Sequence, residues 1–189
     1  MEPFEADVAA CLRVLSQGGV ILYPTDTVWG LGCDATNAGA IEKIYHIKQR
    51  PSSKSMITLL AEERDLLHHV AAPDLELFDY LRTVQKPTTV VFDGIIGFAE
   101  NLLAPDGSAG IRIVKDPFCR YLIKRFRKPI VSTSANFSGH PTPANFSAIN
   151  DGLKALADYV VRHRQQETMP AAPSAVIRWH HGNITVLRS

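Results

Sequence analysis

The chain has 189 residues, a length that suits one domain of ordinary size. Hydrophobic residues make up 46% and charged residues 21%, which excludes a disordered chain, a collagen-like chain and a coiled coil. The formal net charge is only +1, so any attraction to nucleic acid or to a membrane would have to come from a local patch.

The first half of the chain predicts helices that alternate with short apolar strands. Apolar residues at helical spacing, followed by two glycines, predict a helix over 7–17. An apolar strand over 20–23, a turn rich in hydroxyls over 24–27 and a helix over 39–48 that Pro51 ends follow it. We then expect a strand over 56–60, helices over 62–70 and 74–84, and a β-branched strand over 88–92.

The second half predicts the same alternation and an antiparallel finish. The expected elements are a strand over 110–114, a helix over 117–126, a strand over 129–132 with a loop after it over 133–143, and short helices near 145–149 and 153–156. Strands over 159–162, 174–178 and 184–187 follow, the last two joined by a turn at His181-Gly182-Asn183. The fold class is therefore α/β: one domain over 1–189 with a twisted, mixed sheet flanked by helices.

Neither a membrane span nor a disulfide framework is indicated. No apolar run approaches the roughly 20 residues that cross a bilayer, and the acidic start Met1–Glu5 lacks the order of a signal peptide. We therefore expect a cytoplasmic protein. Cys11, Cys33 and Cys119 are far apart and odd in number, which favours buried free thiols over disulfides or a zinc site.

Common nucleotide and metal motifs are absent or misplaced. Gly30 and Gly32 form part of a loose dinucleotide fingerprint, but the expected strand ends too early, at Tyr23, for them to form its first turn. The chain has no phosphate-binding P-loop and no Gly-x-Ser-x-Gly elbow. The neighbouring pairs His68-His69 and His180-His181 point apart, so we expect surface residues and no protein metal site.

Three groups of polar residues could carry chemistry. Lys48 and Arg50 would face one side of an extended segment with Lys54 close behind, which suits a polyphosphate or, alternatively, a solvated basic helix end. The stretch Ser132–Gly139 follows an apolar strand and suits either a phosphate-binding turn or an ordinary Ser/Asn turn. Arg112 lies between two isoleucines in a strand, either on a solvated face or aimed into a cleft to bind a carboxylate.

Together these pieces resemble the YrdC-type L-threonylcarbamoyladenylate synthases. The matching stretches are Tyr23–Gly32, Lys48–Pro51, Gly110–Arg112, Pro129–Gly139, Pro173–Ile177 and Leu187-Arg188. The resemblance implies a twisted α/β sheet around a concave, positive cleft. It also implies a reaction in which L-threonine, bicarbonate and ATP, with Mg²⁺ on the phosphates, give threonylcarbamoyl-AMP and pyrophosphate. Downstream tRNA-modification proteins would use that product to make threonylcarbamoyladenosine.

The resemblance also assigns residues. Lys48 and Arg50 would be catalytic. The residues implied to bind ATP are Lys48, Arg50, Lys54, Ser108, Ser134, Asn136, Thr142 and Arg188. The residues implied to bind L-threonine are Thr27, Arg112, Ser132 and Ser174. A carbamate is already an anionic nucleophile, so the absence of a nucleophile triad agrees with this reaction.

Two other functions compete. The family is associated with binding double-stranded RNA and tRNA, and a basic cluster could serve that role without synthase activity: Arg120, Lys124, Arg125, Arg127 and Lys128. A different nucleotidyl- or carbamoyl-transferase could also use the same cleft. An intact Ser134-x-Asn136 motif favours the synthase, because a pure RNA-binding protein needs no nucleotide pocket.

Overall fold

The structure is a computed structural model that describes residues 2–51, 56–180 and 182–189. Within these residues, nine strands form one mixed sheet in the order β7-β1-β2-β6-β3-β5-β4-β8-β9. Three neighbouring pairs are parallel (β1 with β7, β3 with β5, β4 with β8) and the other pairs are antiparallel, so the expected mixed α/β fold is confirmed.

The helices are α1 (Glu5–Ser16), α2 (Ala38–Lys48), α3 (Leu66–His69), α4 (Leu75–Thr83), α5 (Pro117–Phe126) and α6 (Asp151–Leu156). The strands are β1 (Ile21–Tyr23), β2 (Gly30–Gly32), β3 (Ile57–Leu60), β4 (Thr88–Phe92), β5 (Ala109–Ile113), β6 (Ile130–Ser134), β7 (Tyr159–Val160), β8 (Ala175–His180) and β9 (Asn183–Arg188). Short 3-10 turns lie at η1 (Glu63–Asp65), η2 (Glu100–Leu102) and η3 (Phe146–Ala148).

Most expected elements are confirmed, and four differ from expectation. The single helix expected over 62–70 is divided into η1 and α3, and the one expected over 145–149 is only the turn η3. The strand β2 and the turn η2 were not expected. The final hairpin is confirmed, because β8 and β9 pair antiparallel from His180 and Asn183 onward, although His181 itself lies outside the described residues.

Glycines allow β2 to fit between its neighbours. A Cβ at Gly32 would lie 2.5 Å from Cε1 of Tyr23 and 2.7 Å from the carbonyl oxygen of Val131. No side chain fits in such a space. Packing in the folded sheet therefore explains a strand that propensity does not predict.

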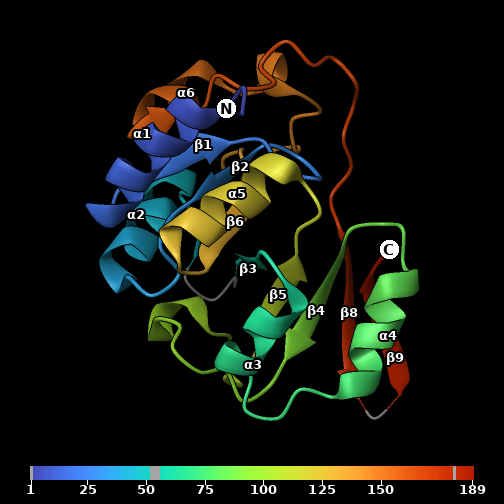
Figure 1. Cartoon of the computed structure of the whole chain (residues 1–189). Helices are drawn as coiled ribbons and strands as arrows, with labels where there is room; N and C mark the ends of the chain where they lie inside the picture. Colours follow the sequence, from blue (N-terminus) through green and yellow to red (C-terminus); the bar gives the residue numbers. More distant parts are fainter. Residues whose placement is uncertain (1, 52–55, 181) are drawn as a thin grey trace.

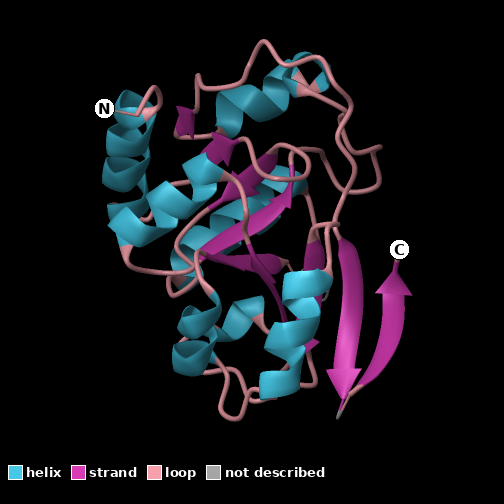
Figure 2. Cartoon of the chain, turned by 45° about the vertical axis from the view of Figure 1, so that its right-hand side comes forward, coloured by secondary structure: helices cyan, strands magenta, loops and turns pink. Residues whose placement is uncertain are grey.

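The helices form two groups, each over its own hydrophobic core (Figure 1). Helices α1, α2, α5 and α6 surround β1, β2 and β6 over a core that includes Leu22, Ile44 and Leu122. Helices α3 and α4 lie against β4, β5 and β8 over a smaller core that includes Leu77 and Ile111. Figure 2 shows β8 and β9 as the outer edge of the sheet.

The remaining sequence expectations concern cysteines and membranes. Cys11, Cys33 and Cys119 are buried free thiols, as expected. Burial raises the pKa of Cys11 to about 12, so this thiol is unreactive at neutral pH. Among the described residues, no helix has both the length and the apolar character that crossing a membrane requires.

A polar pocket lined by arginines and hydroxyls

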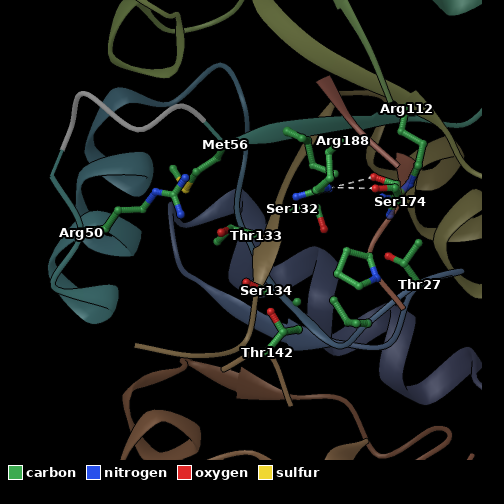
Figure 3. A pocket seen from close by; sticks show the side chains of 14 residues that line it. Thr27, Arg50, Met56, Arg112, Ser132, Thr133, Ser134, Thr142, Ser174 and Arg188 are labelled. Atoms are coloured by element: carbon green, nitrogen blue, oxygen red, sulfur yellow. Dashed lines mark hydrogen bonds between the residues drawn. The ribbon is translucent and has the colours of Figure 1, made fainter. Parts of the chain in front are cut away.

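A pocket is lined by residues of β2, β3, β5, β6 and β9. Its empty volume is about 610 Å³, counting the open mouth. The polar lining residues are Thr27, Arg50, Arg112, Ser132, Thr133, Ser134, Thr142, Ser174 and Arg188. In Figure 3 Arg50 lies at one end, Arg112, Ser174 and Thr27 lie at the other, and the hydroxyls of β6 lie between them. The pocket is therefore elongated, with cations at both ends.

Arg112 is buried, so the alternative of a solvated strand face is wrong. Its side chain is 2% exposed, and it lines the pocket from β5. Nη2 lies 3.0 Å from Oδ1 of Asp26, which makes an ion pair by distance. The angles do not make a hydrogen bond, because Nε and Nη2 of Arg112 form none with the described residues. A buried guanidinium with unused donors is suited to binding a carboxylate.

Hydroxyls surround the Arg112 end of the pocket. Thr25 Oγ1 donates to the carbonyl oxygen of Val28 (2.8 Å), so in its 3.0 Å contact with Thr27 the donor is Thr27 Oγ1. Thr27 Oγ1 therefore keeps lone pairs for a ligand. Ser174 Oγ contacts Thr89 Oγ1 at 2.8 Å and accepts from Nη2 of Arg188 at 3.3 Å.

Gly30 keeps the floor of the pocket open beside Ser132. A Cβ at Gly30 would lie 3.1 Å from Oγ of Ser132 and 3.1 Å from the carbonyl oxygen of Thr133. A larger residue would therefore crowd the Ser132 hydroxyl, which is buried at the pocket wall.

The positive charges of two pocket arginines, Arg50 and Arg188, are destabilised by their surroundings, so an anionic ligand would be favoured beside them. Burial lowers the pKa of Arg50, with Tyr45 opposing this effect. Burial and the nearby Arg112 cation lower the pKa of Arg188. Both guanidinium groups stay charged, because arginine is not deprotonated in proteins. An anion in the pocket would relieve both effects.

Lys48 has a different place from Arg50, although the two are close in sequence. It is almost fully buried and is not among the residues that line the pocket. Its Nζ donates to the carbonyl oxygens of Ser134 (2.5 Å) and Asn136 (2.6 Å). Burial and the Arg50 cation lower the pKa of Lys48 to about 7. Lys48 therefore braces the loop that follows β6.

Of the other residues that the resemblance assigns to ATP, some line the pocket and others hydrogen-bond within neighbouring loops. Ser134 and Thr142 line the pocket. Asn136 shapes the loop, because its Oδ1 accepts from Ser134 Oγ (2.5 Å) and its Nδ2 donates to His140 O (2.6 Å). Ser108 donates to Oδ1 of Asp106 (2.6 Å) and is not among the lining residues. Lys54 lies outside the described residues.

Sequence reasoning missed Asp26 and Gly30. Asp26 stands between two threonines, where an acid suggests ordinary turn chemistry. Only its tertiary contact with Arg112 reveals another role. The sequence puts Gly30 in a loose dinucleotide fingerprint, whereas the structure places it in a strand that lines the pocket.

These features define an α/β protein with a polar pocket whose arginines and hydroxyls suit an anionic ligand. The model of the Sua5/YciO/YrdC family, described as telomere recombination, matches residues 13–189. The chain belongs to this family.

Curated relatives cover most of the chain. A protein of Pseudoalteromonas translucida named threonylcarbamoyl-AMP synthase is 35% identical over 160 residues, which is 83% of this chain and 86% of the relative. One of Vibrio vulnificus with the same name is 30% identical over 176 residues, which is 88% of this chain and 95% of the relative.

Solved structures share the fold at lower identity. E. coli YciO has a TM-score of 0.84 and 22% identity, and the match covers 100% of this chain and 91% of YciO. P. abyssi Sua5 complexed with L-threonine has a TM-score of 0.85 and 21% identity, and the match covers 97% of this chain. The chain spans little more than half of that Sua5, 54% of its length.

Proposed function

We propose that the protein is an L-threonylcarbamoyladenylate synthase, which makes threonylcarbamoyl-AMP and pyrophosphate from L-threonine, bicarbonate and ATP. The observation that supports this most is that Thr27, Arg112, Ser132 and Ser174 line one pocket, although they are far apart in the sequence. Relatives named threonylcarbamoyl-AMP synthase, and the L-threonine complex of a protein with the same fold, support the same proposal.

In this proposal L-threonine binds at the Arg112 end. The guanidinium of Arg112 takes the α-carboxylate, because its planar fork matches two carboxylate oxygens. The hydroxyls of Thr27, Ser132 and Ser174 orient the amino acid and its own hydroxyl. A small, polar wall of this kind favours threonine over an apolar isostere.

ATP binds with its phosphates toward Arg50, Ser134 and Thr142. The threonine amine and bicarbonate first give a carbamate and water. A carbamate oxygen then attacks the α-phosphorus, an O–P bond forms, and the bond from the α-phosphorus to the bridging oxygen breaks as pyrophosphate leaves. Arg50 stabilises negative charge on the phosphates, and the buried Lys48 holds the Ser134–Asn136 backbone in place.

Mg²⁺ would arrive with ATP in this proposal. Among the described residues there is no group of three or more His, Cys, Asp or Glu side chains that could hold a metal. The residues thus do not form a protein metal site, and the ion would be carried by the triphosphate oxygens.

The product would pass to cytoplasmic proteins that modify tRNA.

RNA binding by this chain itself has weaker support, because four of the five clustered cations contact acids. Lys124 and Arg120 contact Glu62, Arg125 contacts Glu5, and Lys128 contacts Asp34. Paired charges of this kind are typical of a solvated surface.

Incubation with ATP, bicarbonate and a panel of amino acids tests the proposal. We expect pyrophosphate and threonylcarbamoyl-AMP, detected by mass spectrometry, with threonine preferred over serine and valine. A different preferred amino acid would assign the pocket to another transferase. No turnover, together with tight binding of double-stranded RNA, would favour the RNA-binding alternative.

A further inference from the structure

Asp26 is the acid that faces the buried Arg112 guanidinium. Its Oδ1 lies 3.0 Å from Nη2 of Arg112, and the two side chains are 10% and 2% exposed. A charge buried this deeply is strongly unfavourable without an opposite charge. Each of the two residues therefore supplies the opposite charge beside the other.

Charge alone holds this pair together. Nε and Nη2 of Arg112 and both carboxylate oxygens of Asp26 are buried, and none forms a hydrogen bond with the described residues. Buried donors without acceptors are unfavourable, so a ligand carboxylate that supplies acceptors would complete the arrangement. The fork of Arg112 can accept such a ligand without first breaking a hydrogen bond within the described chain.

The turn that carries Asp26 is fixed from several sides. Oγ1 of Thr25 accepts from the backbone N–H of Thr27 at 3.0 Å. Arg164 Nη1 donates to the carbonyl oxygen of Thr25 at 3.1 Å, and Cys119 Sγ donates to that of Pro24 at 3.3 Å. A carboxylate on such a turn is a rigid support for the guanidinium.

Asp26 supports Arg112 from outside the pocket. Arg112 lines the pocket, whereas Asp26 is not among the lining residues and borders the neighbouring cavities instead. Asp26 would therefore act on a ligand through Arg112 and not by contact.

The charge of this pair differs from that of the rest of the pocket. Asp26 offsets the charge of Arg112, so this end of the pocket carries less positive charge than its two neighbouring arginines, Arg112 and Arg188, would give it alone, which suits a zwitterionic amino acid better than a phosphate. Among the described residues the guanidinium of Arg188 hydrogen-bonds the uncharged Ser174, whereas Arg50 lies at the far end of the pocket (Figure 3). Polyphosphate, with its higher charge, is favoured there.

We propose that Asp26 is a positioning and specificity-determining residue, which fixes the Arg112 guanidinium and offsets its charge so that this end of the pocket takes an amino acid and excludes phosphate. The proposal rests on the proposed function, because it takes L-threonine as the ligand of Arg112.

Asp26→Asn tests it, because the change removes the charge and keeps the size. Using calorimetry on the full chain, we expect the Kd for L-threonine to rise roughly tenfold or more and the Kd for ATP to stay unchanged. Inorganic pyrophosphate should begin to compete with threonine. The control is Asp79→Asn, which removes an exposed acid 3.0 Å from Arg82 and should change none of these values.

A double-mutant cycle separates positioning through Arg112 from a general structural effect. In the Arg112→Lys background, Asp26→Asn should change the threonine Kd much less than in the wild type. Equal effects in both backgrounds, or an unchanged threonine Kd in Asp26→Asn, would overturn the proposal.

Asp26→Glu provides a second test if the Asn variant does not fold. It keeps the charge and displaces the carboxylate, so we expect weaker threonine binding while pyrophosphate remains excluded. Wild-type affinity for threonine in this variant would overturn the proposal. Absence of threonine binding by the wild type would instead refute the proposed function, and this inference with it.

Discussion

Lys48 and Arg50 are expected to act differently, and a pair of substitutions separates them. Lys48→Met removes the ammonium and keeps most of the volume. The carbonyl oxygens of Ser134 and Asn136 then lose their donor inside the protein, and buried acceptors left without a donor cost about 1–3 kcal/mol. The wild type and the variant are compared above pH 7, where Lys48 is mostly neutral, so relief of a buried charge does not offset this loss. We expect the free energy of unfolding to fall by about 2 kcal/mol. In a domain of this size that lowers Tm by roughly 4–8 °C.

Arg50→Met should instead lower the rate. Arg50 is half-buried at the pocket, so its loss should change the free energy of unfolding by only about 0.5 kcal/mol. Losing one charged contact to the transition state costs about 3 kcal/mol, roughly a hundredfold in rate. Thermal unfolding and pyrophosphate release, measured on both variants, give the two readouts. An unchanged Tm in Lys48→Met would refute the bracing role, and a wild-type rate in Arg50→Met would refute the phosphate role.

Three further predictions concern the pocket and pH. Arg112→Lys keeps the charge but loses the planar fork, so threonine affinity should fall roughly tenfold or more while ATP affinity stays the same by calorimetry. Serine should compete with threonine better than valine does, because Thr27, Ser132 and Ser174 offer hydroxyls; equal competition by valine would contradict this. Because the pKa of Lys48 is lowered from 10.5 to about 7, the unfolded chain binds the extra proton above pH 7. Wild-type stability should therefore rise with pH above 7 relative to Lys48→Met in denaturant titrations, and parallel curves would refute the lowered pKa.

Local sequence signals predicted much of the fold. The bounds of β4 and α5 match expectation, because a β-branched run and a proline at the first helical position are strong local signals. The strand β2 was not predicted, because glycine has a low strand propensity. Glycine is needed there because a side chain at Gly32 would collide with the nearby Tyr23 ring. The helix expected over 62–70 was too long, because apolar spacing alone does not fix where a 3-10 turn gives way to a helix.

The candidate site was only partly predictable. The family resemblance predicted that hydroxyl residues such as Thr27 and Ser174 belong to one binding site. These residues are far apart in the sequence, and the folded sheet brings them to the same pocket. Spacing suggested that Lys48 and Arg50 share a face, but the helix ends between them with Gln49 in a left-handed conformation (φ 51°). That turn directs Lys48 into the interior and leaves Arg50 at the pocket. Asp26 could not be predicted, because its partner is distant in sequence.

Transfer of labelled bicarbonate tests the central claim most directly. The protein is incubated with [¹⁴C]bicarbonate, ATP and L-threonine, and the nucleotide product is separated and counted. The account predicts label in threonylcarbamoyl-AMP in a one-to-one ratio with pyrophosphate, and none when threonine is omitted. Pyrophosphate release without label in the nucleotide product would mean that the chain activates a different acid, and would contradict the account.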